Sequence, residues 1–94
     1  MAKAQPIQRM STPTKLVLRV LLRAPSRWLC GADIAACTDL GRPTVYGILQ
    51  RLTDARWLVR RDEAGDPSEL GRPLKRFYAM TSAGKEEAAK RLAA

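Results

Sequence analysis

The sequence contains no histidine and only two cysteines, Cys30 and Cys37. Without histidine, the chain lacks the most common general base and the usual partner of a nucleophilic serine or cysteine. Two thiols alone cannot supply the four ligands of a tetrahedral zinc site. We therefore expect a protein that is not an enzyme, that needs no metal or other cofactor, and whose two cysteines are free thiols.

Long apolar runs are also missing. No stretch is long enough to cross a membrane as a helix, and the opening residues MAKAQPIQRM have no apolar segment of the signal-peptide type. We expect a cytoplasmic protein with no membrane partner.

Acidic residues are few, with 9 Asp and Glu against 17 Lys and Arg, which gives a net charge of +8. Such an excess favours a polyanionic partner, and double-stranded DNA is the leading candidate. An anionic membrane surface, or a basic face with no partner, would give the same composition.

The order of local patterns predicts a mainly α-helical domain with a small β-hairpin, a winged helix-turn-helix. Residues 1–11 are expected to form a flexible basic arm, and residues 12–94 the domain. Thr12 is the expected cap of the first helix, which Pro25 closes. The expected elements that follow are a short apolar strand at 28–30, a brief helix at 31–37, a turn at 38–41, a helix at 42–55, strands at 57–63 and 74–80 joined by a loop at 64–73, and a closing helix at 81–94.

The helix at 42–55 carries the strongest pattern. Val45, Ile48, Leu49 and Leu52 fall on one apolar stripe of a helix, so the opposite face is expected to be exposed. Gly47 in the middle of this helix lowers its stability by about 1 kcal/mol relative to alanine. A glycine is nevertheless reasonable where the floor of a DNA groove must approach the helix backbone closely. The residues expected to contact DNA from this helix are Arg42, Pro43, Thr44, Tyr46, Gly47, Gln50 and Arg51. An ordinary solvated helix face is the alternative.

The tetrapeptide LGRP occurs twice, at residues 40–43 and 70–73. The surrounding sequences share almost nothing, so a duplicated repeat is excluded. Each copy places a bend and a cation at a surface that would face DNA: one at a helix start that favours phosphate, the other beside a groove of negative potential. The wing at 60–76 is expected to contribute Arg60, Arg72, Lys75 and Arg76 to DNA binding. A loop that neutralises its own charges is the alternative.

The first helix has an apolar arc wider than packing on one side requires. The helix is either central in the domain or shared with a second subunit, and we favour the second interpretation, because a small domain often gains stability by pairing. The expected dimer interface consists of Leu16, Val17, Val20 and Leu21.

The chain resembles the PadR-like winged-helix transcriptional regulators. The resemblance rests on Thr44-Val45-Tyr46, Leu49-Gln50-Arg51-Leu52, Gly71-Arg72-Pro73, Phe77-Tyr78 and Thr81-Ser82-Ala83-Gly84. It implies a dimeric, sequence-specific DNA-binding protein, usually a repressor. In that arrangement Thr44, Tyr46 and Arg51 hold the recognition helix on the DNA backbone, and Arg72 belongs to the wing.

Three features depart from the family pattern. Gly41 stands where a capping serine or threonine is usual, and Ala55-Arg56 where glycine is usual, which predicts a strained turn at Arg56. Few residues follow Gly84, whereas family members carry a longer helical region that dimerises them and frames an effector pocket. The sequence therefore does not predict a small-molecule effector.

These patterns together predict a DNA-binding transcriptional regulator, with helix 42–55 in the major groove and wing 60–76 on the adjacent groove or backbone. The alternatives are a winged-helix module that binds another protein, and an architectural or recombination-directionality factor of a mobile element.

Overall fold

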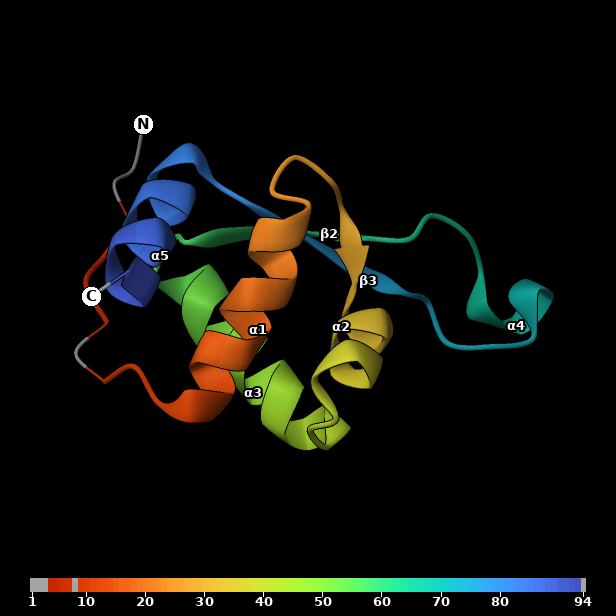
Figure 1. The fold of residues 1–94 in the computed structure, drawn as a ribbon. Helices are drawn as coiled ribbons and strands as arrows, with labels where there is room; N and C mark the ends of the chain where they lie inside the picture. The colour runs from red at the N-terminus through yellow and green to blue at the C-terminus, as the bar shows by residue number, and fades with distance from the viewer. Residues whose placement is uncertain (1–3, 8, 94) are drawn as a thin grey trace.

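The computed structural model describes residues 4–7 and 9–93, and its elements follow the predicted order. Helices alternate with the strands of one small sheet (Figure 1), so the predicted mainly α winged helix is confirmed. The elements are α1 (Thr12–Arg23), β1 (Leu29–Cys30), α2 (Gly31–Thr38), α3 (Arg42–Asp54), β2 (Leu58–Asp62), α4 (Pro67–Leu70), β3 (Arg76–Met80) and α5 (Ser82–Ala93).

The sheet has three antiparallel strands in the order β1-β3-β2. The hairpin pairs Leu58 with Met80 at its base and Asp62 with Arg76 at its outer end. The two-residue strand β1 adds to the other edge of β3, where Leu29 lies opposite Tyr78. The hairpin is therefore anchored on both sides of β3, close to the start of α2.

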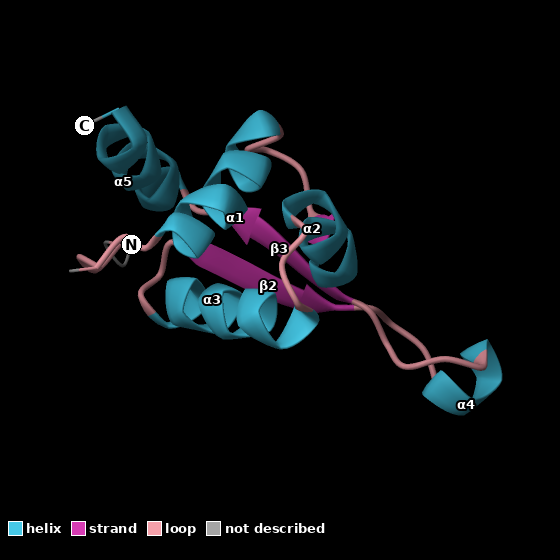
Figure 2. Ribbon diagram, turned by 60° about the horizontal axis from the view of Figure 1, so that its bottom comes forward, coloured by secondary structure: helices cyan, strands magenta, loops and turns pink. Residues whose placement is uncertain are grey.

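The wing extends beyond the sheet to a single helical turn, α4, which projects away from the body (Figure 2). The sequence predicted an irregular loop here. Asp66 caps this turn by accepting a hydrogen bond from the backbone N–H of Ser68 at 2.9 Å, and Gly71 ends it with a φ of 69°. The short polar segment thus supplies its own start and stop signals.

The core forms where α1, α2 and α3 pack over one face of the sheet. The predicted stripe of α3 is confirmed, because Val45, Ile48, Leu49 and Leu52 are all buried. Helix α1 begins one residue earlier than expected, since Ser11 and not Thr12 is its cap and accepts from the N–H of Thr14.

The wide apolar arc of α1 is largely used within the chain itself. Val17 and Leu21 are fully buried in the core and offer no surface to a second subunit. That part of the expected dimer interface is corrected by the structure: packing against α2, α3 and α5 takes up these side chains. Leu16 and Val20 remain half-buried.

The described part of the predicted arm lies against the domain. The N–H of Gln5 donates to the carbonyl of Ala55 at 2.7 Å, and its own carbonyl accepts from Trp57 Nε1 at 2.6 Å. The Arg91 guanidinium donates to the carbonyl of Ile7 at 2.7 Å. Hydrogen bonds to its backbone thus hold the segment 5–7 between the end of α3 and α5, a role that composition alone does not reveal. Residues 1–3 and 8 of the arm lie outside the described residues.

Two backbone positions fix the turn between α3 and the sheet. Arg56 adopts a φ of 65°, which confirms the strained turn expected where glycine is usual. Gly84 lies against the backbone of Trp57, so closely that a Cβ at residue 84 would overlap the Trp57 carbonyl. In the sequence Gly84 is noted only as part of the motif at residues 81–84, and the structure shows that it allows α5 to dock.

We expect Gly84→Ala to lower the free energy of unfolding by about 2 kcal/mol, the usual scale for overpacking, despite the better helix propensity of alanine. Gly47→Ala is the matched control, since nothing lies within 4 Å of a Cβ at Gly47, and it should raise stability by up to about 1 kcal/mol. Urea denaturation of both variants measures the difference. A Gly84→Ala protein as stable as the wild type would show that α5 does not need this close contact.

Candidate nucleic-acid interface

The amino end of α3 carries groups suited to an anion. Gly41 is the N-cap and supplies no side-chain hydrogen bond, so the first backbone N–H groups of the helix keep their donor capacity. The following residue, Arg42, is exposed. A helix start with unsatisfied donors and an adjacent guanidinium favours a phosphate group.

The outward face of α3 is accessible along its length. The side chains of Thr44, Gln50 and Arg51 are exposed, and so is the backbone at Gly47. The space around a Cβ at Gly47 is empty, so nothing within the described chain demands a glycine there. A partner that approaches the helix backbone closely would explain the residue.

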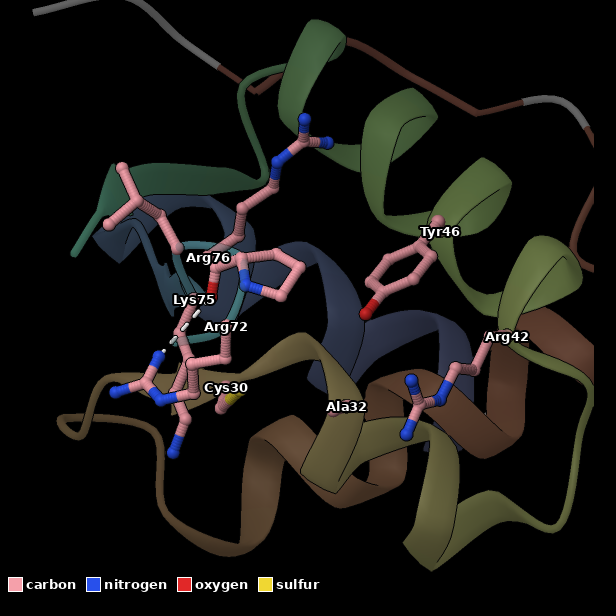
Figure 3. A pocket seen from close by; sticks show the side chains of 9 residues that line it. Cys30, Ala32, Arg42, Tyr46, Arg72, Lys75 and Arg76 are labelled. Carbon is pink, nitrogen blue, oxygen red and sulfur yellow. Dashed lines mark hydrogen bonds between the residues drawn. The ribbon is translucent and has the colours of Figure 1, made fainter. Parts of the chain in front are cut away.

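A cleft of about 490 Å³ lies between α3 and the base of the wing. Figure 3 shows Tyr46 pointing from α3 into this cleft, with Arg42 at the start of the same helix. The opposite side is formed by the limb of the wing that returns to β3. The lining residues are Cys30, Ala32, Arg42, Tyr46, Arg72, Pro73, Leu74, Lys75 and Arg76. The structure therefore brings together five of the predicted DNA-contacting residues, from two segments far apart in the sequence.

Arg72 lines the cleft but does not present a free guanidinium. Its two terminal nitrogens donate to the two carboxylate oxygens of Glu63 at 2.6 and 3.0 Å, and one of them also donates to the Pro73 carbonyl. These hydrogen bonds, with one from the Lys75 N–H, lower the pKa of Glu63 from 4.5 to about 2. Arg72 thus ties the two limbs of the wing together, a pairing that the sequence prediction missed although Glu63 and Lys75 are hairpin neighbours.

The charges of the wing are divided along its length. The acidic residues Asp66 and Glu69 lie in the outer part, where residues 62–70 contain no basic side chain, whereas Asp62 and Glu63 lie opposite Arg76 and Lys75 across the hairpin. Lys75 and Arg76 lie at the base, and within the described residues neither takes part in an ion pair. The cationic surface therefore belongs to the base of the wing and not to its tip.

Six predicted residues lie outside the cleft lining: Thr44, Gly47 and Gln50 on the outward face of α3, and Pro43, Arg51 and Arg60 elsewhere. Arg60 is on β2 and forms a 3.5 Å ion pair with Asp62. Arg51 lies on another side of α3, beside Ile7 and Arg9 of the amino-terminal segment. Pro43 is exposed in the first turn of α3.

The cysteines contribute no metal site. Both are free thiols, Cys30 buried beside the cleft and Cys37 exposed on α2. In the part of the chain that the structure describes, no three metal-ligating side chains gather, and no helix is both long and apolar enough to cross a membrane.

The Glu63–Arg72 pair has a pH signature. Because the folded pKa of Glu63 is depressed, its support of the wing is complete above pH 4.5 and is lost as the pH falls toward 2. NMR titration of the Glu63 carboxyl should give a midpoint near 2, and Arg72→Ala should return it toward 4.5. An unchanged Glu63 midpoint in the variant would show that Arg72 does not hold this carboxylate.

The comparisons with known proteins agree on one fold. The MarR family model matches residues 10–66, and none of the curated protein sequences matches the chain. Among solved structures, PadR of Bacillus subtilis in complex with operator DNA superposes with a TM-score of 0.70 at 22% identity, covering 87% of this chain and 48% of PadR.

Two further structures are similar. MepR of S. aureus in its DNA complex gives a TM-score of 0.69 at 19% identity, and the superposition covers 88% of this chain and 62% of MepR. BpsR of Bordetella bronchiseptica, whose DNA binding is regulated by 6-hydroxynicotinic acid, gives a TM-score of 0.69 at 19% identity. The superposition covers 96% of this chain and 62% of BpsR. At these identities the likeness shows the fold, and the chain spans between 48% and 62% of these proteins' length.

Proposed function

The chain belongs to the MarR family, and we propose that it is a sequence-specific double-stranded DNA-binding transcription regulator that works in the cytoplasm. The observation that carries the proposal is the cleft where the start of α3 meets the base of the wing, lined by Arg42, Tyr46, Lys75 and Arg76. In this arrangement α3 enters the major groove and a DNA backbone runs through the cleft. The structurally similar PadR and MepR are solved in complex with DNA, which supports a DNA-binding role for this fold.

The polar groups of the interface have different tasks. Arg42, Lys75, Arg76 and the Tyr46 hydroxyl contact phosphates, which positions the protein without reading sequence. Gln50 projects from the exposed face of α3 and reads base edges, while Gly47 lets the groove floor approach the helix. Arg72 shapes the wing through Glu63, so the wing contacts DNA with its base.

We also infer a PadR-like character for the carboxy-terminal part of the chain, which lies beyond the family match at residues 10–66. The motif that begins at Thr81 has a structural role here. Its hydroxyl accepts from the N–H of Gly84 at 2.9 Å and donates to the Arg56 carbonyl at 2.9 Å. The cap and the docking glycine thus act as one unit that places α5 on the end of α3.

We further propose that the protein is a repressor that binds as a homodimer. Leu16 is half-buried on α1 without being part of the core cluster, and Val20 lies on the same helix. A two-fold axis near α1 and α5 would leave the wings at the outer ends, because α5 and α4 lie at opposite ends of the molecule (Figure 1). Two copies of α3 would then read half-sites about one helical turn of DNA apart.

A second candidate is a module that binds another protein, favoured by the acidic outer wing with its exposed Leu70. Such a module would have little affinity for random duplex at physiological salt. The two proposals therefore differ in a single binding measurement.

Fluorescence anisotropy with a labelled duplex tests the proposed function. If about 6–8 cations of a dimer neutralise phosphates, log K should fall against log salt with a slope of about −5 to −7. Arg42→Ala should weaken binding to every duplex and reduce the slope by about 2 per dimer, because each subunit then neutralises one phosphate fewer. Arg27→Ala is the matched control, since it removes one exposed arginine from the turn after α1, outside the cleft lining and off α5. Binding that is independent of salt, or equally affected by both variants, contradicts the proposal.

A further inference from the structure

Asp54 is the last residue of α3 and shares the exposed face of the helix with Gln50, one turn earlier. The Gln50 Nε2 donates a hydrogen bond to Asp54 Oδ1 at 2.9 Å. Among the described residues Asp54 forms no ion pair, although the chain is strongly basic. An acidic group on a surface proposed to meet phosphates is unfavourable for binding unless it has a separate task.

The bond to Asp54 fixes the orientation of the Gln50 amide. The last torsion of glutamine is broad and roughly two-fold, so a free amide exchanges the places of its oxygen and nitrogen easily. A hydrogen bond to a carboxylate is stronger than one between neutral groups. It holds Nε2 toward the carboxyl end of α3, and Oε1 is directed to the other side.

The fixed amide retains what a base contact needs. Nε2 has two hydrogens, of which Asp54 takes one, and Oε1 stays free as an acceptor. Gln50 therefore offers one donor and one acceptor side by side in a constant order. Adenine is the base whose major-groove edge matches such a pair, with N7 as acceptor and N6 as donor.

We propose that Asp54 is a specificity-determining positioning residue, which makes Gln50 select adenine by fixing the orientation of its amide. This inference rests on the proposed function, since it concerns the base that α3 reads. Asp54 itself touches no base, and its negative charge lowers the affinity for all duplexes equally.

A bond between exposed residues one turn apart also stabilises a helix, so a stability effect alone does not test the proposal. The informative readout is base preference at one position of the site. A selection from a random duplex pool with the wild-type protein supplies the site. Affinities are then measured for four duplexes that differ only at the position where Gln50→Ala loses its preference.

The wild type should prefer adenine there by about tenfold or more, the usual range for a bidentate contact. Asp54→Ala should reduce this preference to about threefold or less. The double variant should match Gln50→Ala in base preference, because Asp54 influences the choice of base only through Gln50. Asp54→Asn keeps an acceptor oxygen and should retain the preference while binding every duplex more tightly. Glu86→Gln, an exposed site on α5, makes the same change in net charge away from α3.

The outcomes separate the two proposals. Wild-type protein that binds no duplex at physiological salt defeats the proposed function. Wild-type protein that selects a site, with adenine preference unchanged in Asp54→Ala or with additive effects of the two substitutions, overturns the role of Asp54 and leaves the proposed function standing. The role of Asp54 is also overturned if Gln50→Ala loses no base preference at any position of the selected site.

Discussion

The placement of Trp57 is the constraint on which the rest of the structure depends. Its indole is fully buried, and its N–H donates to the backbone of residue 5. Its carbonyl accepts from the N–H of Thr81 at 3.0 Å, and Gly84 lies against its backbone. The end of α3, the first strand of the wing, the start of α5 and the amino-terminal segment all meet at this residue. The angle between α3 and the wing, and therefore the shape of the cleft, follows from this junction.

The cleft and the wing show how charge can be divided within a short segment. A wing whose outer part, residues 64–70, has two acidic side chains and no basic one cannot lay its tip on phosphates without repulsion. The pairing of Arg72 with Glu63 joins the two limbs, while Lys75 and Arg76 line the cleft and, among the described residues, form no ion pair. The rigidity of the wing and its affinity for an anion are thus provided by different residues.

Features that depend on local periodicity could be predicted from the sequence. The buried stripe of α3 follows from its spacing, and the left-handed turn at Arg56 from the lack of a glycine after the helix. The cationic base of the wing could be anticipated from the basic residues at 72–76. The shape of the cleft could not, because it depends on long-range packing. The pairing of Arg72 with Glu63 and the docking of residues 5–7 depend on geometry between segments, which composition does not encode. The apolar arc of α1 predicted packing against a second subunit, but the core of the same chain covers most of the arc.

The central claim is that the exposed face of α3 and the base of the wing form one surface for a duplex. NMR titration of the labelled protein with duplex DNA tests this most directly, because each backbone amide reports separately. The account predicts that the largest shifts fall in residues 42–50 and 72–76, with small changes in 66–70 at the tip of the wing. Shifts concentrated in the tip or in α5, with 42–50 unchanged, would contradict it.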